Sequence, residues 1–377
     1  MNKAANINFK ISIIINSANK SDEVLFDDEI FYHFKSDNTD KICIKNSSIE
    51  IIGHRDSTLA FKGFTEAENL NNFYKSTIYT QILRSLIFYC YKTSECPKIA
   101  SITFVINNDE KNKIVKSKDE INFLGKFVGK STLLDFSKLN AKRIFERGDA
   151  GKCFFDSSLY LLQALTEENE FFRFERLWRS FNNIFNYAGQ THTDSDGLKN
   201  IKEFIKNNDR SFALSLNFLT SIDTKLLYSL RWKECILYQI HQGKYFFDSI
   251  REYSYPTIVE IFKSREDWLE QIKNQYKKYA TKNNNKDILK AVNSLEQLPA
   301  YFSKLTEDNS KGKKNEDYLT LIMRWYIYFV RCSYFHGNKN DRKYSLFKDP
   351  LLSELQFINE YLQLLIVDCL SNKQIMK

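Results

Sequence analysis

Two residues in the stretch RCSYFHGNK (331–339) have side chains that can act together on a phosphodiester: Arg331 and, five positions later, His336. Arginine binds phosphate through a planar fork of donors and stabilises the charge that builds on it during cleavage. Histidine accepts and donates protons near neutral pH. Because the 2′-hydroxyl of RNA already lies beside the scissile phosphate, the pair suits RNA cleavage without a metal ion. The sequence shows no carboxylate cluster of the kind that a two-metal site needs.

Arg331 lies near the end of a long apolar helix that the spacing predicts over residues 316–335, and His336 follows it directly. Gly337 adopts the left-handed conformation without penalty, so we expect the helix to end at His336. The negative end of the helix dipole favours the charged imidazole there and raises its pKa. On an ideal helix Arg331 and His336 point about 140° apart. They therefore meet at one ligand only if the last turn loosens or if a second copy supplies partner groups.

Three pieces of sequence together resemble a known family. Arg331 and His336 form an R-x-x-x-x-H motif that HGNK (336–339) continues, and DPLL (349–352) opens a final amphipathic helix. Upstream, FERLWRSFNNIFNYAG (174–189) forms an aromatic helix whose rings are predicted to be core residues. In these features the C-terminal 200 residues or so resemble HEPN-domain ribonucleases of the Apea-like kind. The motif spacing alone is weakly specific, and its surroundings strengthen the resemblance.

The resemblance implies a fold, a site and partners. It implies an all-α bundle that forms a homodimer, in which two motifs face each other and build one composite site. It implies a metal-independent endoribonuclease of single-stranded RNA or tRNA loops, working in antiviral defence or as a toxin held by an inhibitor or awaiting an activator protein. Arg331 would hold the phosphate and His336 would assist proton transfer, with Asn338 and Lys339 as candidate RNA contacts. No cofactor and no metal are expected.

The residue after the motif arginine departs from the family pattern. Active members commonly carry a polar Asn, Asp or His there, whereas this chain has Cys332, and a thiol is a poor hydrogen-bond donor. Ser333 is the neighbour that can compensate. Three alternatives therefore remain: an active nuclease, an inactive HEPN-like module that binds RNA or protein, and a structural helical adaptor. Beside these stands the plain interpretation of the motif itself, in which Arg331 is an ordinary surface arginine and His336 an ordinary helix-terminal histidine.

The elements that position this site are predicted to follow a separate N-terminal α+β domain, residues 1–145, with a sensing, regulatory or substrate-positioning role. Short runs rich in β-branched and aromatic residues predict strands at 7–15, 29–34, 41–52, 58–64 and 98–107. Helical spacing predicts one helix over 70–91. The polar, lysine-rich residues 108–119 are expected to be a connector.

The remaining residues, 150–377, are predicted to form the all-α HEPN-like domain. Candidate helices lie at 154–165, 171–188, 197–208, 224–241, 257–280, 287–298, 316–335 and 350–370. The last has a clear start, because Asp349 can cap it and Pro350 suits its first position. The loop THTDSD (191–196) could offer His192, Asp194 and Asp196 to a metal, but we expect it to cap the helix that follows.

Composition limits the remaining classes. The 377 residues carry a formal charge of +8, which permits a polyanionic partner without requiring one. Seven scattered cysteines without a C-x-x-C pair predict reduced thiols and neither a disulfide framework nor a zinc site. No signal peptide or membrane-spanning run is apparent, so we expect a cytoplasmic protein.

Overall fold

The chain is described by a computed structural model that divides into two compact units. The first unit comprises Met1–Tyr187 with Cys369–Lys377, and the second comprises Ala188–Asp368. The structure describes residues 7–16, 22–55, 70–107, 109–121, 123–129, 134–191, 193–241, 266–294, 300, 319–335 and 350–375. The predicted strand at 58–64 lies outside these residues, as do His336, Asn338 and Lys339 of the motif.

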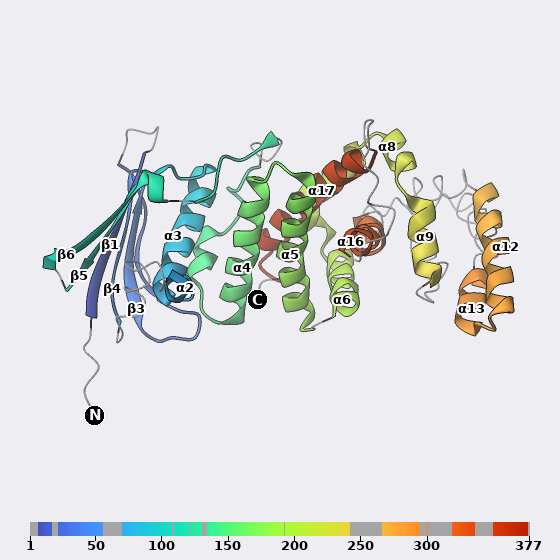
Figure 1. Cartoon of the computed structure of the whole chain (residues 1–377), viewed down its shortest axis with the longest axis horizontal. Coiled ribbons are helices and arrows are strands. Elements are labelled where there is room, and N and C mark those ends of the chain that lie inside the picture. The colour runs from blue at the N-terminus through green and yellow to red at the C-terminus, as the bar shows by residue number, and fades with distance from the viewer. Residues whose placement is uncertain are drawn as a thin grey trace, which may run out of the picture. The chain divides into compact units, whose positions relative to one another are not determined.

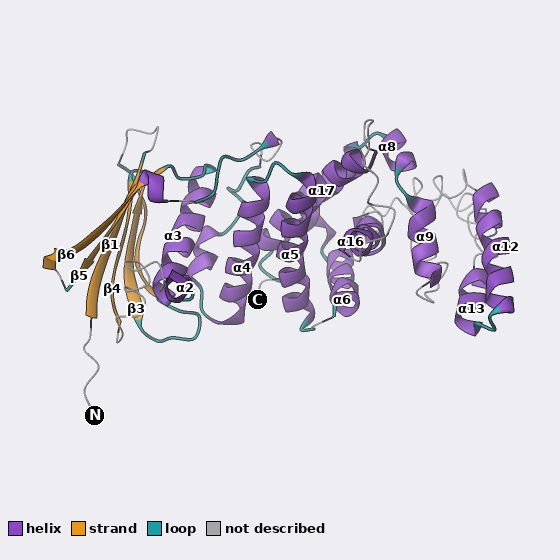
Figure 2. Cartoon of the chain, in the orientation of Figure 1, coloured by secondary structure: helices purple, strands orange, loops and turns teal. Residues whose placement is uncertain are grey.

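An antiparallel sheet opens the first unit (Figures 1 and 2). Its described strands run in the spatial order β2-β3-β4-β1-β5-β6, and every neighbouring pair is antiparallel. Their bounds are β1 (Ile7–Ile15), β2 (Val24–Phe31), β3 (Thr39–Lys45), β4 (Ser48–Arg55), β5 (Ile99–Ile106) and β6 (Asp109–Ser117).

One face of this sheet is covered by helices. Side chains alternate between the faces of a strand, and every second residue of β1 is buried: Ile7, Phe9, Ile11, Ile13 and Ile15. The helix that packs against β3 and β4 is α3 (Thr77–Thr93), and α2 (Leu70–Tyr74) precedes it. Figure 1 shows α4 (Gly148–Leu165) and α5 (Glu170–Gly189) following α3 away from the sheet, and the short η4 (Ala141–Phe145) packs against both α3 and α4.

The structure confirms two predicted strands closely, 7–15 as β1 and 98–107 as β5, and it corrects other predicted elements. The predicted strand 41–52 is a hairpin of β3 and β4, and 29–34 overlaps only the end of β2. The predicted helix 70–91 is broken, because the side chain of Ser76 caps a new helix by accepting from the N–H of Tyr79 at 3.1 Å.

The predicted connector at 108–119 is wrong, because its described residues, 109–119, belong to strand β6 and the short turn η2 (Lys118–Glu120). In the described sheet β6 pairs only with β5 and stands at an edge. Edge strands are commonly rich in lysine, which discourages pairing with another chain. The composition that indicated a connector is therefore that of an edge strand.

The compact units do not divide at residues 145–150, where the domain boundary is predicted. Helix α4 and α5 as far as Tyr187 belong to the first unit, where aromatic contacts join α4 to earlier elements and the Ser180 hydroxyl of α5 donates to the carbonyl of Ser157 on α4 at 2.7 Å. The ring of Phe155 on α4 lies 5.8 Å from that of Phe34, and the ring of Phe154 lies 6.4 Å from that of Tyr91 on α3. Of the aromatic residues of α5 that are predicted to be core, Trp178 is 4% exposed and Phe181 is fully buried, whereas Tyr187 is only partly buried.

The described part of the second unit is helical. Its elements are α6 (Asp194–Asn207), η5 (Asp209–Phe212), α7 (Ala213–Ser221), α8 (Thr224–Ser229), α9 (Trp232–His241), α12 (Glu266–Lys282), α13 (Lys286–Ser294), the π-helical η7 (Ile322–Ile327), α16 (Tyr328–Phe335) and α17 (Pro350–Ser371), which extends into the first unit. Pro350 begins α17, as predicted. In the described part of the chain, no helix is long and apolar enough to cross a membrane.

Helix α7 has a start signal that is distant in the sequence. The carboxylate of Asp368 on α17 accepts hydrogen bonds from the N–H groups of Leu214 and Ser215, at 3.3 and 2.9 Å, and from the Ser215 hydroxyl at 2.7 Å. A carboxylate at this end satisfies N–H groups that a helix leaves without intrahelical partners. The described residues thus combine an antiparallel sheet with a helical region, which confirms the α+β class.

Candidate functional site

Arg331 lies on α16, the last described helix before the end of the predicted motif. Its side chain is partly exposed, at 25%. The residues of the motif from His336 onward are outside the described part, so the structure neither joins them to Arg331 nor separates them from it. The prediction that Arg331 and His336 form one site therefore remains a prediction.

The predicted helix 316–335 contains a change of helix type. Residues Ile322–Ile327 form the π-helical η7, and Tyr328 then continues as the α-helix α16. Single π-helical turns are rare and often occur at functional sites. The element is buried almost all round, since Ile322, Met323 and Tyr326 are fully covered. The apolar segment Ile322–Phe335 is therefore a core helix, and Arg331 lies near its C-terminal end.

The guanidinium of Arg331 faces a carboxylate from another helix. Its Nη2 lies 3.5 Å from Oδ2 of Asp194, whose side chain is 20% exposed. Its Nη1 lies 3.8 Å from the sulfur of Cys332. Both side chains of the ion pair thus reach solvent, and the pair is close to the outer limit for direct contact.

Asp194 stands at the start of α6, which the loop THTDSD was predicted to cap. The prediction is confirmed: the Thr193 hydroxyl accepts from the N–H of Asp196 at 3.3 Å and donates to its carboxylate at 2.7 Å. Asp194 occupies the first turn, where the helix dipole favours negative charge. The cap fixes the turn that brings Asp194 to Arg331.

Two tyrosine hydroxyls join this group of side chains. Tyr328 precedes Arg331 by three residues, so the two share one side of α16, and Tyr238 comes from α9, which packs against α16. Burial and interactions with the Cys332 thiol raise the pKa of both tyrosines, while Arg331 acts to lower them. Each hydroxyl therefore keeps its proton at neutral pH and can donate a hydrogen bond.

Cys332 and Ser333, the residues beside Arg331, face inward. Cys332 is 4% exposed and Ser333 is 5% exposed. The Cys332 thiol interacts with the tyrosine hydroxyls of Tyr238 and Tyr328. Both tyrosines are half-buried, so as residues they are more exposed than the Cys332 and Ser333 side chains that the sequence singled out.

A buried ion pair holds α16 in place. Arg231, between α8 and α9, binds the carboxylate of Glu354 on α17 through Nε at 3.0 Å and Nη2 at 2.7 Å. The hydroxyl of Tyr326 also donates to Glu354, and it accepts from the N–H of Arg231 at 2.7 Å. The guanidinium lies over the rings of Phe329 and Tyr334 on α16, at 5.2 and 5.7 Å.

This ion pair has a structural role. Glu354 is 4% exposed, and its side chain is bound by both Arg231 and Tyr326. Although burial acts against the charged guanidinium, hydrogen bonding and attraction from Glu354 raise the pKa of Arg231. Arg231 therefore stays charged, and the pair connects α17 to the helix that carries Arg331.

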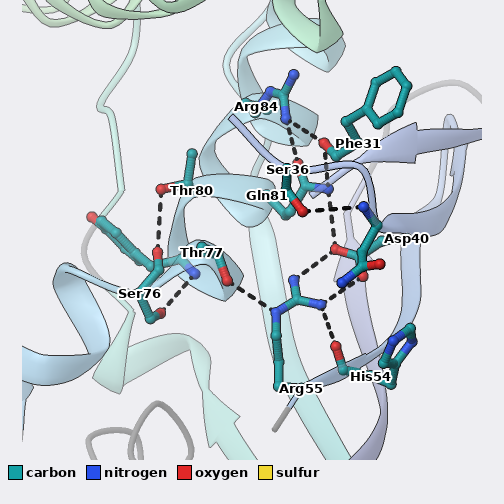
Figure 3. Close-up of polar contacts among 12 residues, drawn as sticks. Phe31, Ser36, Asp40, His54, Arg55, Ser76, Thr77, Thr80, Gln81 and Arg84 are labelled. Carbon is teal, nitrogen blue, oxygen red and sulfur yellow. Dashed lines mark hydrogen bonds and ion pairs between the residues drawn. The ribbon is translucent and has the colours of Figure 1, made fainter. Parts of the chain in front are cut away.

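The first unit contains a second polar cluster, at the junction of the sheet and α3 (Figure 3). Asp40, with its side chain fully buried, accepts two hydrogen bonds from Arg55 at 2.8 and 2.7 Å and one from Gln81 at 3.1 Å. The Arg55 guanidinium also lies over the rings of Tyr32 and Phe9, at 4.1 and 5.0 Å. Such a double contact is among the stronger side-chain interactions.

Arg84 extends this cluster, and its hydrogen bonds go to backbone carbonyls and to an amide side chain. It donates to the backbone carbonyls of Phe31 at 2.8 Å, Ile144 at 2.6 Å and Glu146 at 3.3 Å, and to the side chain of Gln81 at 2.9 Å. Burial lowers its pKa to about 10, so it remains charged at neutral pH. Arg84 is fully buried, and it joins strand β2, helix α3 and η4. We therefore assign this cluster to folding.

The Arg331 group is the better functional candidate because its charged side chains reach solvent. A guanidinium and two protonated hydroxyls converge there, and this set of donors suits a phosphate. Among the described residues, no three His, Cys, Asp or Glu side chains gather in a way that could hold a metal ion. Family models, curated proteins and solved structures were compared with the chain, and none matches.

Proposed function

We propose that the protein is a cytoplasmic, metal-independent endoribonuclease that cuts single-stranded RNA, such as a tRNA loop, with Arg331 and His336 as its catalytic residues. One observation carries the proposal: the partly exposed side chain of Arg331 interacts with Tyr238 and Tyr328, on a helix that the Arg231–Glu354 pair anchors. A phosphodiester bound there meets a rigid cation and neutral donors.

The chemistry needs two roles. Arg331 holds the non-bridging oxygens of the phosphate and stabilises the charge that builds on them. His336 assists proton transfer as the 2′-oxygen attacks phosphorus and the 5′-oxygen leaves. The products are a 2′,3′-cyclic phosphate and a 5′-hydroxyl, with no water consumed. Single-stranded RNA is favoured because its sugars and bases are accessible.

The resemblance to HEPN-domain nucleases supports the remaining parts of the proposal. It favours a homodimer with a composite site, which would also solve the angular separation of Arg331 and His336 on one helix. It favours a role in antiviral defence or in a toxin–antitoxin system, where an inhibitor or activator protein controls cleavage. The first unit would then sense a signal or position the RNA.

Cleavage in the presence of EDTA tests the catalytic proposal. Total tRNA and a mixed single-stranded RNA are incubated with the wild type, Arg331→Ala and His336→Ala. The matched control is Arg324→Ala, which removes an arginine of the same helical segment whose guanidinium lies 5.0 Å from the ring of Trp325. Wild type and control should cut, and the other two should lose at least 100-fold in rate, as is usual when such groups are removed.

The outcome that sinks this mechanism is activity that EDTA abolishes and magnesium restores. Products with a 3′-hydroxyl would contradict it as well, because attack by the 2′-oxygen leaves a cyclic phosphate. Equal loss of activity in Arg324→Ala and Arg331→Ala would indicate that the helix, and not its arginine, was damaged.

A second candidate function is an HEPN-like module that binds RNA or protein without cutting. The burial of Cys332, which is 4% exposed, favours it, because that position is commonly polar in active members of the family. This candidate predicts RNA binding that weakens steeply with salt and no cleavage by the wild type, Arg324→Ala, Arg331→Ala or His336→Ala. A Cys332→Asn variant that gains cleavage would point to a degenerate nuclease site.

A further inference from the structure

We propose that Asp194 is an internal competitor of RNA: in the free protein its carboxylate occupies the position on Arg331 that a phosphate takes. The inference rests on the proposed function and adds a control of the same site. It predicts that RNA binding begins with the exchange of one anion, Asp194, for another. The negative charge of Asp194 would thereby lower the affinity for RNA.

The geometry of the ion pair favours exchange. Arg331 and Asp194 approach to 3.5 Å, with side chains 25% and 20% exposed. In the structural pair Arg231–Glu354 the corresponding distance is 2.7 Å, and although the Arg231 side chain is 23% exposed, much like that of Arg331, the Glu354 side chain is only 4% exposed. Charge-assisted hydrogen bonds are shorter, at about 2.7–2.9 Å. A phosphate that makes such bonds can replace the longer contact with Asp194, whereas the buried pair is closed to it.

The surroundings of Asp194 would stabilise any anion there, a phosphate as well as the Asp194 carboxylate. Asp194 lies in the first turn of the 14-residue helix α6, where the helix dipole stabilises negative charge. Tyr328, on the side of α16 that carries Arg331, offers a protonated hydroxyl. A phosphate that arrives here finds the same guanidinium and an added donor. The displaced carboxylate remains nearby and repels the phosphate, which restrains binding further.

Asp196 provides a matched control. It lies in the same first turn and carries the same charge, but its carboxylate accepts a hydrogen bond from Thr193 and belongs to the helix cap. If any negative charge at this helix end weakens RNA binding, Asp194→Asn and Asp196→Asn should behave alike. If Asp194 competes for Arg331, only Asp194→Asn should change binding, and only while Arg331 is present.

The experiment measures binding of a fluorescent, single-stranded RNA whose riboses are 2′-O-methylated, so that it cannot be cleaved. The full chain is used at fixed salt with EDTA, as wild type, Asp194→Asn, Asp196→Asn, Arg331→Ala and the double variant Asp194→Asn with Arg331→Ala. We expect Asp194→Asn to bind about two- to fivefold tighter, the range that an exposed ion pair supplies. We expect no gain from Asp196→Asn, and none from Asp194→Asn when Arg331 is absent.

Several outcomes overturn the inference, and they separate it from the proposed function. If Arg331→Ala weakens binding while Asp194→Asn binds like the wild type or more weakly, the competitor role fails and the RNA site stands. Equal tightening by Asp194→Asn and Asp196→Asn also overturns it, because the effect is then general charge. If Arg331→Ala binds like the wild type, the RNA site itself fails. Asp194→Ala, measured alongside, must tighten binding as Asp194→Asn does, and thermal unfolding verifies that both are folded.

Discussion

Gly53 lies against the buried carboxylate of Asp40, so closely that a β-carbon at Gly53 would come within 1.9 Å of Asp40 Oδ1. This carboxylate cannot move aside easily, because Arg55 and Gln81 hold it with three hydrogen bonds. Strand β4 therefore needs a residue without a side chain at this position. The requirement comes from the cluster at the junction of the sheet and α3, and not from a turn.

Gly53→Ala should destabilise the first unit. The new methyl group would push Asp40 away from Arg55, and overpacking of this kind typically costs about 1–3 kcal/mol in the free energy of unfolding. The measurement is chemical denaturation followed by fluorescence and by far-UV circular dichroism. The sheet signal should be lost at lower denaturant than in the wild type.

Gly125→Ala is the matched control, since a β-carbon there meets no atom within 4 Å among the described residues. We expect its stability to remain within about 0.5 kcal/mol of the wild type, as is usual for surface substitutions. Equal stability of Gly53→Ala and Gly125→Ala would show that Asp40 is not held as the structure describes.

Glu354→Gln should destabilise the second unit strongly. The substitution leaves Arg231 beside a neutral amide in a largely buried place, and removing one partner of a buried pair costs about 3–5 kcal/mol. Tyr326 would also lose the charged acceptor of its hydroxyl. Because Arg231 is 23% exposed, we expect the lower end of this range, measured as a change in the free energy of unfolding.

The exposed pair Arg179–Glu175 on α5 supplies the comparison. Its side chains are 55% and 27% exposed, so Glu175→Gln removes the same kind of charge from a solvated pair. Exposed pairs contribute about 0.2–1 kcal/mol. If Glu354→Gln were as mild as Glu175→Gln, the buried pair would not anchor α16, and the rigidity that we assign to Arg331 would lose its basis.

The sequence predicts an element well where its signal is local. In β1 an apolar residue recurs at every second position, and Pro350 marks the start of α17, so both elements are predicted at the right positions. The predicted strand 41–52 contains the polar residues KNSS (45–48) at its middle, and the chain turns there, so that β3 and β4 pair with each other. Helix α7 is missed because its carboxylate cap, Asp368, is over 150 residues away.

The candidate site shows the same division. The motif singles out Arg331, and Tyr328 could have been found with it, because residues three apart share one side of a helix. Asp194 and Tyr238 reach the site from α6 and α9, and no spacing in the sequence relates them to Arg331. Only packing brings them together. The inward position of Cys332 and Ser333 likewise depends on the helices around α16.

Alkaline pH should destabilise the first unit through Cys153. Burial raises the pKa of this thiol from 9.0 to about 12, so the folded state keeps a proton that the unfolded state releases. The unfolded state therefore gains stability as the pH rises above 9, until the folded thiol ionises near pH 12. One pKa unit corresponds to about 1.4 kcal/mol, which is roughly the loss expected from this thiol between pH 8 and pH 10.

Comparison with Cys153→Ala isolates this contribution, because alanine has no proton to release. The difference in unfolding free energy between wild type and variant should shift against the wild type between pH 8 and pH 10. A difference that stays constant over this range would mean that the thiol ionises alike in both states, which its burial at 7% exposure argues against.

Arg331→Lys should separate phosphate binding from catalysis in the proposed nuclease. Lysine keeps the positive charge but lacks the planar fork that grips a phosphate with two donors. Each phosphate contact on single-stranded RNA contributes about −0.7 to the slope of log binding constant against log salt concentration. We expect Arg331→Ala to reduce the slope by about this amount and Arg331→Lys to keep it.

Cleavage in EDTA should fall at least tenfold in both variants. Arg324→Ala should alter neither quantity. A lysine variant that cuts at the wild-type rate would show that charge alone suffices, and the role given to the guanidinium fork would be wrong.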